Sequence, residues 1–184
     1  MLETCSRESS ACQLQSRLAE RAAELRNAAV SRSVTVVLNH WQRPVENLLG
    51  QLRAAVASIA VEVWVCIFGS PLAEAYQAAI DLVQAEEEVG RPSKIRTVHS
   101  DVDFGVYGRF LVASTAKTAF VYMVDDDVPF PVSAVEQYLR HAVRQSSIWG
   151  HAGHVRSVDP RHAKWVDRPR MPTLVDYANA AWFL

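Results

Sequence analysis

Three consecutive aspartates, Asp125, Asp126 and Asp127, directly follow an apolar run at residues 120–124. Adjacent carboxylates repel one another, so such a triplet is costly unless a cation lies beside it. Carboxylate oxygens suit Mg²⁺ and Mn²⁺, which usually also bind phosphate oxygens of a substrate. If the chain stays extended, Asp125 and Asp127 point to one side and Asp126 to the other. The triplet therefore predicts a Mg²⁺ or Mn²⁺ site, with a solvated acidic turn as the alternative.

Polar residues also follow three earlier apolar runs of the chain. These runs are rich in β-branched residues, which is typical of strands buried on both faces. Helical patterns separate them, and this alternation predicts an α/β fold with a mostly parallel sheet and helices on both faces. The carboxyl ends of such strands meet at one edge, where ligands bind. Asn39 and Arg43 follow the run at residues 34–38, and Gly69 and Ser70 follow the run at 61–68. Asp101 and Asp103 follow the run at 94–98, so all six residues are expected at this edge.

Apolar residues at helical spacing predict four helices between and after these strands. The first follows Pro44 and the second runs from Ser70, its expected N-cap, to Gly90. The third covers residues 108–117, and the fourth begins near Ser133. The inward-facing residues expected on the first and fourth helices are Val45, Leu48, Leu49, Leu52, Val56 and Ile59, and Val135, Tyr138, Leu139 and Val143. Beyond residue 147 we expect a strand over 148–155, a loop over 159–172 and an unfinished element from 175.

The first part of the chain differs from the rest. After a polar tail, Leu14, Leu18, Ala22 and Leu25 recur at helical spacing and predict an amphipathic helix. We therefore divide the chain into an N-terminal helical extension, residues 1–32, and an α/β domain, residues 33–184.

Composition narrows the function classes. The chain has 184 residues, of which 49% are hydrophobic and 21% charged, with a formal net charge of −1. The hydrophobic content argues against a disordered chain. The near equality of acidic and basic residues argues against a nucleic-acid partner, because proteins that bind nucleic acids carry an excess of basic residues.

The cysteines and the apolar stretches exclude further classes. Cys5, Cys12 and Cys66 form no C-x-x-C pair, so neither a disulfide framework nor a zinc knuckle is expected. Cys66 lies inside an apolar strand and is predicted to be a buried small hydrophobe. The first residues lack the apolar core of a signal peptide, and the apolar stretch 54–68 is interrupted by polar residues. It is shorter than the roughly 18 residues of a membrane span. The sequence predicts a soluble chain without a span.

Three segments carry a family resemblance: residues 34–43, residues 104–110 (FGVYGRF) and residues 120–127 (FVYMVDDD). Together they resemble a GT-A glycosyltransferase, above all the family-2-like enzymes and the exostosin-type C-terminal domain. The resemblance covers residues 34–184 and implies a Rossmann-like GT-A fold. In that family a D-x-D motif at the end of a central strand holds a divalent metal and the diphosphate of a nucleotide sugar.

By this resemblance Asp125 contacts the ribose or the metal, Asp127 is the metal ligand, and Asp126 assists or faces the sugar. The loop 39–43, which begins at Asn39, surrounds the nucleotide base. Arg109 lies near the phosphates or the sugar, where a guanidinium can bind two phosphate oxygens at once.

For several of these residues a second interpretation stays open. Arg43, assigned to the donor site, is alternatively a solvated charge before a helix. Arg109 alternatively pairs with Asp101 or Asp103. Asp176 matches the position of an acceptor-side acidic residue in the family, and an ordinary surface aspartate is the alternative.

The resemblance implies a metal-dependent hexosyltransferase that moves a sugar from a nucleotide-diphosphate donor to an acceptor hydroxyl. Mn²⁺ or Mg²⁺ would act as a Lewis acid on the leaving diphosphate. A UDP-sugar is the favoured donor, and a glycan or another hydroxyl compound is the acceptor. Eukaryotic relatives sit in the secretory pathway, so the resemblance implies a Golgi or ER location if an upstream membrane anchor exists.

The chain departs from the family pattern in two places. Its second strand ends in Phe68-Gly69 where many relatives have a base-reading Asp or Asn, so Asn39 and Asp101 are expected to take over this contact. The chain also stops at Leu184, before the usual acceptor-binding elements. A truncated, non-catalytic domain that binds nucleotide sugars or proteins is therefore one alternative. A sugar-phosphate nucleotidyltransferase is another, but its glycine-rich loop is missing after the first strand.

Overall fold

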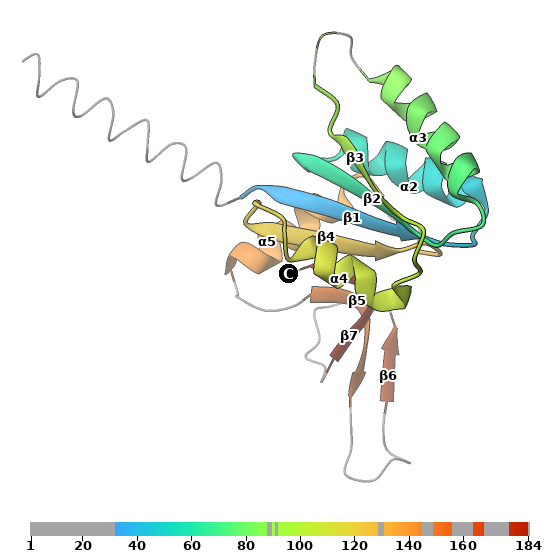
Figure 1. Ribbon diagram of the computed structural model, residues 1–184. Helices are drawn as coiled ribbons and strands as arrows, with labels where there is room; N and C mark the ends of the chain where they lie inside the picture. Colours follow the sequence, from blue (N-terminus) through green and yellow to red (C-terminus); the bar gives the residue numbers. More distant parts are fainter. Residues whose placement is uncertain are drawn as a thin grey trace, which may run out of the picture.

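The computed structural model describes residues 32–87, 90, 92–128 and 131–144 with their side chains, and the backbone of three later strands (Figure 1). The amphipathic helix predicted near the N-terminus lies outside the described residues. The division at residue 32 therefore stays a prediction.

The described strands form one seven-stranded sheet in the order β3-β2-β1-β4-β7-β5-β6. Strands β1 to β4 are parallel, which confirms the predicted parallel core of a Rossmann-like α/β fold. β7 joins β4 in antiparallel orientation, and β5 and β6 extend that side. The strands are β1 (Val34–His40), β2 (Glu62–Phe68), β3 (Ile95–Ser100), β4 (Phe120–Asp125), β5 (Trp149–Val155), β6 (Lys164–Asp167) and β7 (Tyr177–Phe183).

Helices cover both faces of the parallel strands, as predicted (Figure 1). On one face lie α2 (Val45–Ala57), α3 (Ala73–Glu86) and α5 (Ala134–Arg144). On the other lies the short α4 (Gly108–Ala113). Among the described residues no helix has both the length and the apolar character needed to cross a membrane.

The core is divided by the sheet because neighbouring strand residues point to opposite faces. Val36 and Leu38 of β1 pack under α2, α3 and α5, whereas Val37 packs on the α4 side with Cys66. Full burial of such side chains stabilises the fold by about 1.5–3 kcal/mol each. Cys66 is fully buried, as predicted, and this burial raises the pKa of its thiol to about 12.

Two predicted core residues are exposed. Ile59 lies beyond the end of α2 at Ala57 and is 47% exposed. Val143 of α5 is 49% exposed, because the buried face of that helix passes through Leu139 and Ala142.

Three element boundaries also differ from the prediction. α3 begins at Ala73, and Ser70 instead closes the turn before it, where its Oγ accepts a hydrogen bond from the Leu72 amide at 3.1 Å. β6 lies inside the predicted loop 159–172, because its pairing with β5 stabilises a segment that has no strand pattern of its own. α4 ends at Ala113, four residues earlier than expected.

Candidate functional site

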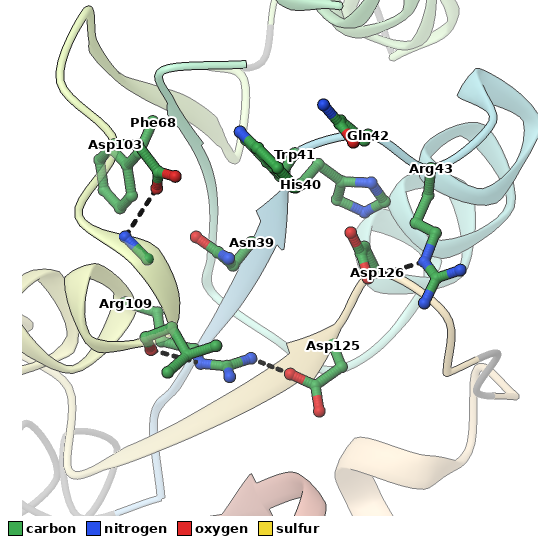
Figure 2. Close-up of a pocket in the computed structure, with 12 residues that line it drawn as sticks. Asn39, His40, Trp41, Gln42, Arg43, Phe68, Asp103, Arg109, Asp125 and Asp126 are labelled. Carbon is green, nitrogen blue, oxygen red and sulfur yellow. Dashed lines mark hydrogen bonds and ion pairs between the residues drawn. The ribbon is translucent and has the colours of Figure 1, made fainter. Parts of the chain in front are cut away.

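A cavity of about 520 Å³ opens at the carboxyl edge of the parallel strands (Figure 2). It lies beside the carboxyl ends of β1 and β4, where the strand order reverses. Parallel sheets bind ligands at this switch point, and the volume is typical of small-molecule sites. The lining residues are Asn39, His40, Trp41, Gln42, Arg43, Phe68, Asp103, Gly105, Val106, Arg109, Asp125 and Asp126.

An ion pair between Arg109 and Asp125 spans the base of this cavity (Figure 2). Nη1 of Arg109 donates to Oδ1 of Asp125, and its Nε donates to the Val106 carbonyl oxygen at 3.0 Å. The arginine side chain is 6% exposed and the aspartate 23%. Burial lowers the pKa of Arg109, against the opposing attraction of Asp126. The structure thus pairs Arg109 with the end of β4 rather than with Asp101 or Asp103.

Arg43 lies at the rim, next to the other two aspartates. Its Nε is 3.4 Å from Oδ1 of Asp126, and its Nη2 donates to Oδ2 of Asp127 at 2.8 Å. Arg43 and Asp127 are both 51% exposed. Exposed ion pairs of this kind contribute about 0–1 kcal/mol to the free energy of unfolding. The contacts of Arg43 therefore affect the charge at the rim of the cavity more than the stability of the fold.

The acidic triplet does not continue the strand. β4 ends at Asp125, and the Val128 amide donates to the Asp125 carbonyl oxygen at 3.1 Å, which closes a turn. The expected alternation along an extended chain is therefore wrong beyond Asp125. In the turn, Asp126 lines the cavity with Asp125, whereas Asp127 lies outside the lining and bonds to Arg43.

The loop after β1 is held from three sides. Trp41 Nε1 donates to the Gly69 carbonyl oxygen at 3.2 Å, and the Ser70 hydroxyl donates to the Trp41 carbonyl oxygen. The Tyr76 hydroxyl of α3 donates to the Arg43 carbonyl oxygen at 2.6 Å. These bonds fix the backbone of the loop 39–43, so the half-exposed indole of Trp41 has a defined place on the cavity wall.

Gly69 allows the loops after β2 and β3 to meet. Its φ is +55°, and a Cβ there would lie 2.7 Å from the Asp103 amide nitrogen. We expect Gly69→Ala to lower the free energy of unfolding by about 1–3 kcal/mol, through strain and displacement of the Asp103 loop. Urea denaturation measures the change. Gly50→Ala is the control, because a Cβ at this helical position meets nothing within 4 Å. It should be neutral or stabilising, and equal losses in both variants would contradict the close approach.

His40 ends β1 as a buried, neutral side chain. Both amide hydrogens of Gln51 are used, on the carbonyl oxygens of Asp125 and Val128, so Gln51 Oε1 is the acceptor and His40 Nε2 the donor at 2.8 Å. The other ring nitrogen, Nδ1, is buried and has no hydrogen-bond partner within the part of the chain that the structure describes. Burial lowers the pKa of His40, and this outweighs the opposing effects of Gln51 and Asp126.

This burial predicts a pH dependence of stability. The unfolded chain binds a proton at His40 below about pH 6.5, but the folded chain binds it only at lower pH. The stabilisation is therefore complete above pH 6.5 and is lost as the pH falls towards the folded-state pKa. Denaturation of His40→Gln between pH 5 and pH 8 should show a flatter profile than wild type. His99→Gln, at an exposed histidine, should keep the wild-type profile, and a flattening there instead would contradict the assignment.

The predicted site residues divide into three groups. The first group, which lines the cavity described above, is Asn39, Arg43, Arg109, Asp125 and Asp126. Asp127 and Asp101 are exposed residues outside its lining. Asp176 lies outside the described residues.

Sequence reasoning did not assign four residues to the site individually, although it brought Asp103 to this edge and included Trp41 in the loop 39–43. Asp103, and not Asp101, lines the cavity, where its Oδ1 accepts a hydrogen bond from the Gly105 amide at 2.6 Å. Phe68 and Trp41 supply apolar walls. Gln51 bonds to the acidic turn from α2, and its signal was an amide among the buried residues of that helix, between Leu48 and Ala55.

The carboxylate oxygens of Asp125, Asp126 and Asp127 are suitable ligands for a hard cation. The bonds to Arg43 and Arg109 use one oxygen of each aspartate, which leaves the second oxygen of each carboxylate outside these contacts. Among the described residues no group of three His, Cys, Asp or Glu forms a ready-made metal cage. Mg²⁺ characteristically binds one or two carboxylates together with substrate phosphates and waters, so the set fits this class of ion.

No protein-family model and no curated protein matches the chain. Among solved structures, the 4-diphosphocytidyl-2C-methyl-D-erythritol synthase from Anaerococcus prevotii DSM 20548 is similar with a TM-score of 0.52 at 11% identity. The alignment covers 83% of this chain and 70% of the synthase. At this identity the likeness shows a shared fold alone.

Two further structures each have a TM-score of 0.48. TarS 1-349 of S. aureus is 13% identical, with 67% of this chain and 35% of the TarS 1-349 chain covered. The mannosyltransferase PcManGT from Pyrobaculum calidifontis, in complex with GDP-Man and Mn²⁺, is 17% identical, with 70% and 36% covered. The chain thus spans about a third of the length of these two proteins.

Proposed function

We propose that this chain is a metal-dependent glycosyltransferase that moves a sugar from a nucleoside-diphosphate donor to an acceptor hydroxyl. The observation that carries the proposal is the cavity at the switch point of the sheet, which brings carboxylates of β4 together with Arg109 and the loop after β1. A nucleotide diphosphate needs such a combination, because its phosphates require positive charge and its base requires a flat, apolar wall.

Asp125 and Asp127 would hold Mn²⁺ or Mg²⁺, with Asp126 beside them. The cation would supply Lewis-acid stabilisation of the departing nucleoside diphosphate. Arg109 and Arg43 face the same space and are suited to bind phosphate oxygens, which fit the two-pronged geometry of a guanidinium. In the structure both arginines bond to the aspartates, and their two positive charges offset only part of the three carboxylate charges of the turn, so a net negative charge remains for a cation.

The base and ribose would lie against the loop 39–43. Asn39 offers amide groups and Trp41 an indole face, while Asp103, which lines the cavity, would take the role that we assigned to Asp101. A UDP-sugar is the favoured donor and a glycan or other hydroxyl compound the acceptor. Asp176 is proposed as the acceptor-side carboxylate.

A sugar-phosphate nucleotidyltransferase is the second candidate, because the fold is shared with a diphosphocytidyl synthase. Such an enzyme places a glycine-rich, basic loop after its first strand to hold a triphosphate. The corresponding loop, residues 39–43, contains no glycine and is fixed by the bonds of Trp41, Ser70 and Tyr76. This rigidity favours the glycosyltransferase.

Product analysis separates the candidates. We expect slow, Mn²⁺- or Mg²⁺-dependent release of nucleoside diphosphate from a UDP-sugar, which Asp127→Asn abolishes. Asp127 is exposed, so this change leaves the fold intact. Release of pyrophosphate from a nucleoside triphosphate and a sugar 1-phosphate would favour the nucleotidyltransferase instead. Metal-dependent donor binding without any product would support a non-catalytic binding domain.

A further inference from the structure

Gln51 is a buried amide that connects three parts of the candidate site. It lies on α2 and is 4% exposed. Its Nε2 donates to the carbonyl oxygens of Asp125 and Val128, each at 2.7 Å, and its Oε1 accepts from His40 Nε2 at 2.8 Å. The amide therefore joins the end of β1 to both ends of the acidic turn.

Asn47 adds a second amide from the same helix, one turn earlier. Its Nδ2 donates to the Asp126 carbonyl oxygen at 3.0 Å. Asn47 and Gln51 are four residues apart, so they lie on the same side of α2. Between them they bond to three of the four carbonyl oxygens of the turn 125–128. The same turn carries all three aspartates, and its own closing bond runs from the Val128 amide to the Asp125 carbonyl oxygen at 3.1 Å.

We propose that Gln51, assisted by Asn47, is a positioning residue that sets the geometry of the acidic turn for a divalent cation. Gln51 does not line the cavity, so it acts through the backbone that carries the aspartates rather than on the ligand. The inference rests on the proposed function for the identity of the cation, but its contacts do not depend on that function.

The chemistry of the side chain explains why an amide is required. Two carbonyl oxygens need hydrogen-bond donors, and the His40 N–H needs an acceptor, at a place where water is excluded. Glutamate keeps the acceptor but places a carboxylate oxygen against the two carbonyl oxygens. Methionine has a similar length and offers no amide donor. Residues that orient metal ligands in this way typically change metal affinity by about 10–100-fold when they are replaced.

The test uses Mn²⁺ alone and two readouts. Electron paramagnetic resonance of unbound Mn²⁺ gives the dissociation constant, and hydrogen exchange of the Val128 amide without metal reports on the turn. Gln51→Met should raise the dissociation constant about 10–100-fold and speed exchange at Val128 by about tenfold or more. Exchange within β2 should stay unchanged. Gln77→Met is the matched control, because Gln77 lies exposed on α3 and its side chain donates to Asp81 of the same helix at 2.7 Å.

Unchanged exchange at Val128 in Gln51→Met would overturn the inference, as would faster exchange with an unaltered Mn²⁺ affinity. If wild type binds no Mn²⁺, the proposed function fails, and the Val128 exchange still decides whether Gln51 holds the turn. If Gln51→Met does not fold, Asn47→Ala at the exposed end of the pair carries the test. It should give smaller changes of the same sign in both readouts, and wild-type values in both would overturn the inference.

Discussion

Arg109→Met is expected to lower the free energy of unfolding by about 3 kcal/mol, at the lower end of the range for breaking a buried ion pair. The Arg109 side chain is 6% exposed and bonds to Asp125, whose side chain is 23% exposed. Without the arginine, this carboxylate stays largely out of water beside an apolar side chain. The remaining access of Asp125 to solvent keeps the loss near the lower end. Urea denaturation measures it.

Two further variants make this prediction specific. Arg43→Ala removes the other arginine of the site, which is 51% exposed, and should change the free energy of unfolding by less than about 1 kcal/mol. Arg109→Met combined with Asp125→Leu removes both charges and should recover much of the loss, because no unpaired charge remains. Equal losses for Arg43→Ala and Arg109→Met would show that burial does not distinguish the two arginines.

UDP and Mn²⁺ together are expected to raise the midpoint of thermal unfolding by roughly 5–10 °C. At a hundredfold excess over its dissociation constant, a ligand of the folded state adds about 2.7 kcal/mol of stability. For a domain of this length that corresponds to a shift of this size. UDP alone or Mn²⁺ alone should shift the midpoint only slightly, because Asp125 and Asp127 bind the phosphates through the cation in the proposed arrangement.

The variants for this experiment separate metal binding from folding. Asp127→Asn leaves the pair of Arg109 and Asp125 in place, so its midpoint without ligand should match that of wild type, while the shift disappears. Asp125→Asn should lose the shift and also begin from a lower midpoint. A full shift without Mn²⁺, or one that survives Asp127→Asn, would contradict a cation between the aspartates and the diphosphate.

Much of the fold could be predicted because its central strands are buried on both faces. Val34 to Leu38, in which Thr35 is the one polar residue, and Phe120 to Val124 form apolar runs, so the strands, their parallel arrangement and the edge that carries Asn39 and Asp125 follow from the sequence pattern. β6 could not be predicted, because its pairing with β5 supplies what its own residues lack. For α5 the apolar pattern predicted the helix correctly, but it placed Val143 on the buried face, where the structure has Ala142.

The position of the candidate site in the fold could be predicted from the sequence, but the contacts between its residues could not. Strand ends located the aspartates, yet the partner of Arg109 depends on how α4 lies on the sheet, and that is a tertiary property. The turn after Asp125 accepts hydrogen bonds from Gln51, which lies 74 positions from Asp125 in the sequence. A search for apolar stripes passes over such a polar residue, although an amide on a buried helix face indicates that carbonyl or amide groups lie opposite.

Paramagnetic broadening by Mn²⁺ in the NMR spectrum tests the central claim most directly, because it shows where the ion binds. In the presence of UDP, low concentrations of Mn²⁺ should first broaden the amide signals of residues 39–43 and 125–128, around the cavity. Signals of α3 far from the site should persist, and excess Mg²⁺ should restore the broadened ones. Broadening centred elsewhere, or broadening that Asp127→Asn leaves unchanged, would contradict a metal-assisted nucleotide site at this edge of the sheet.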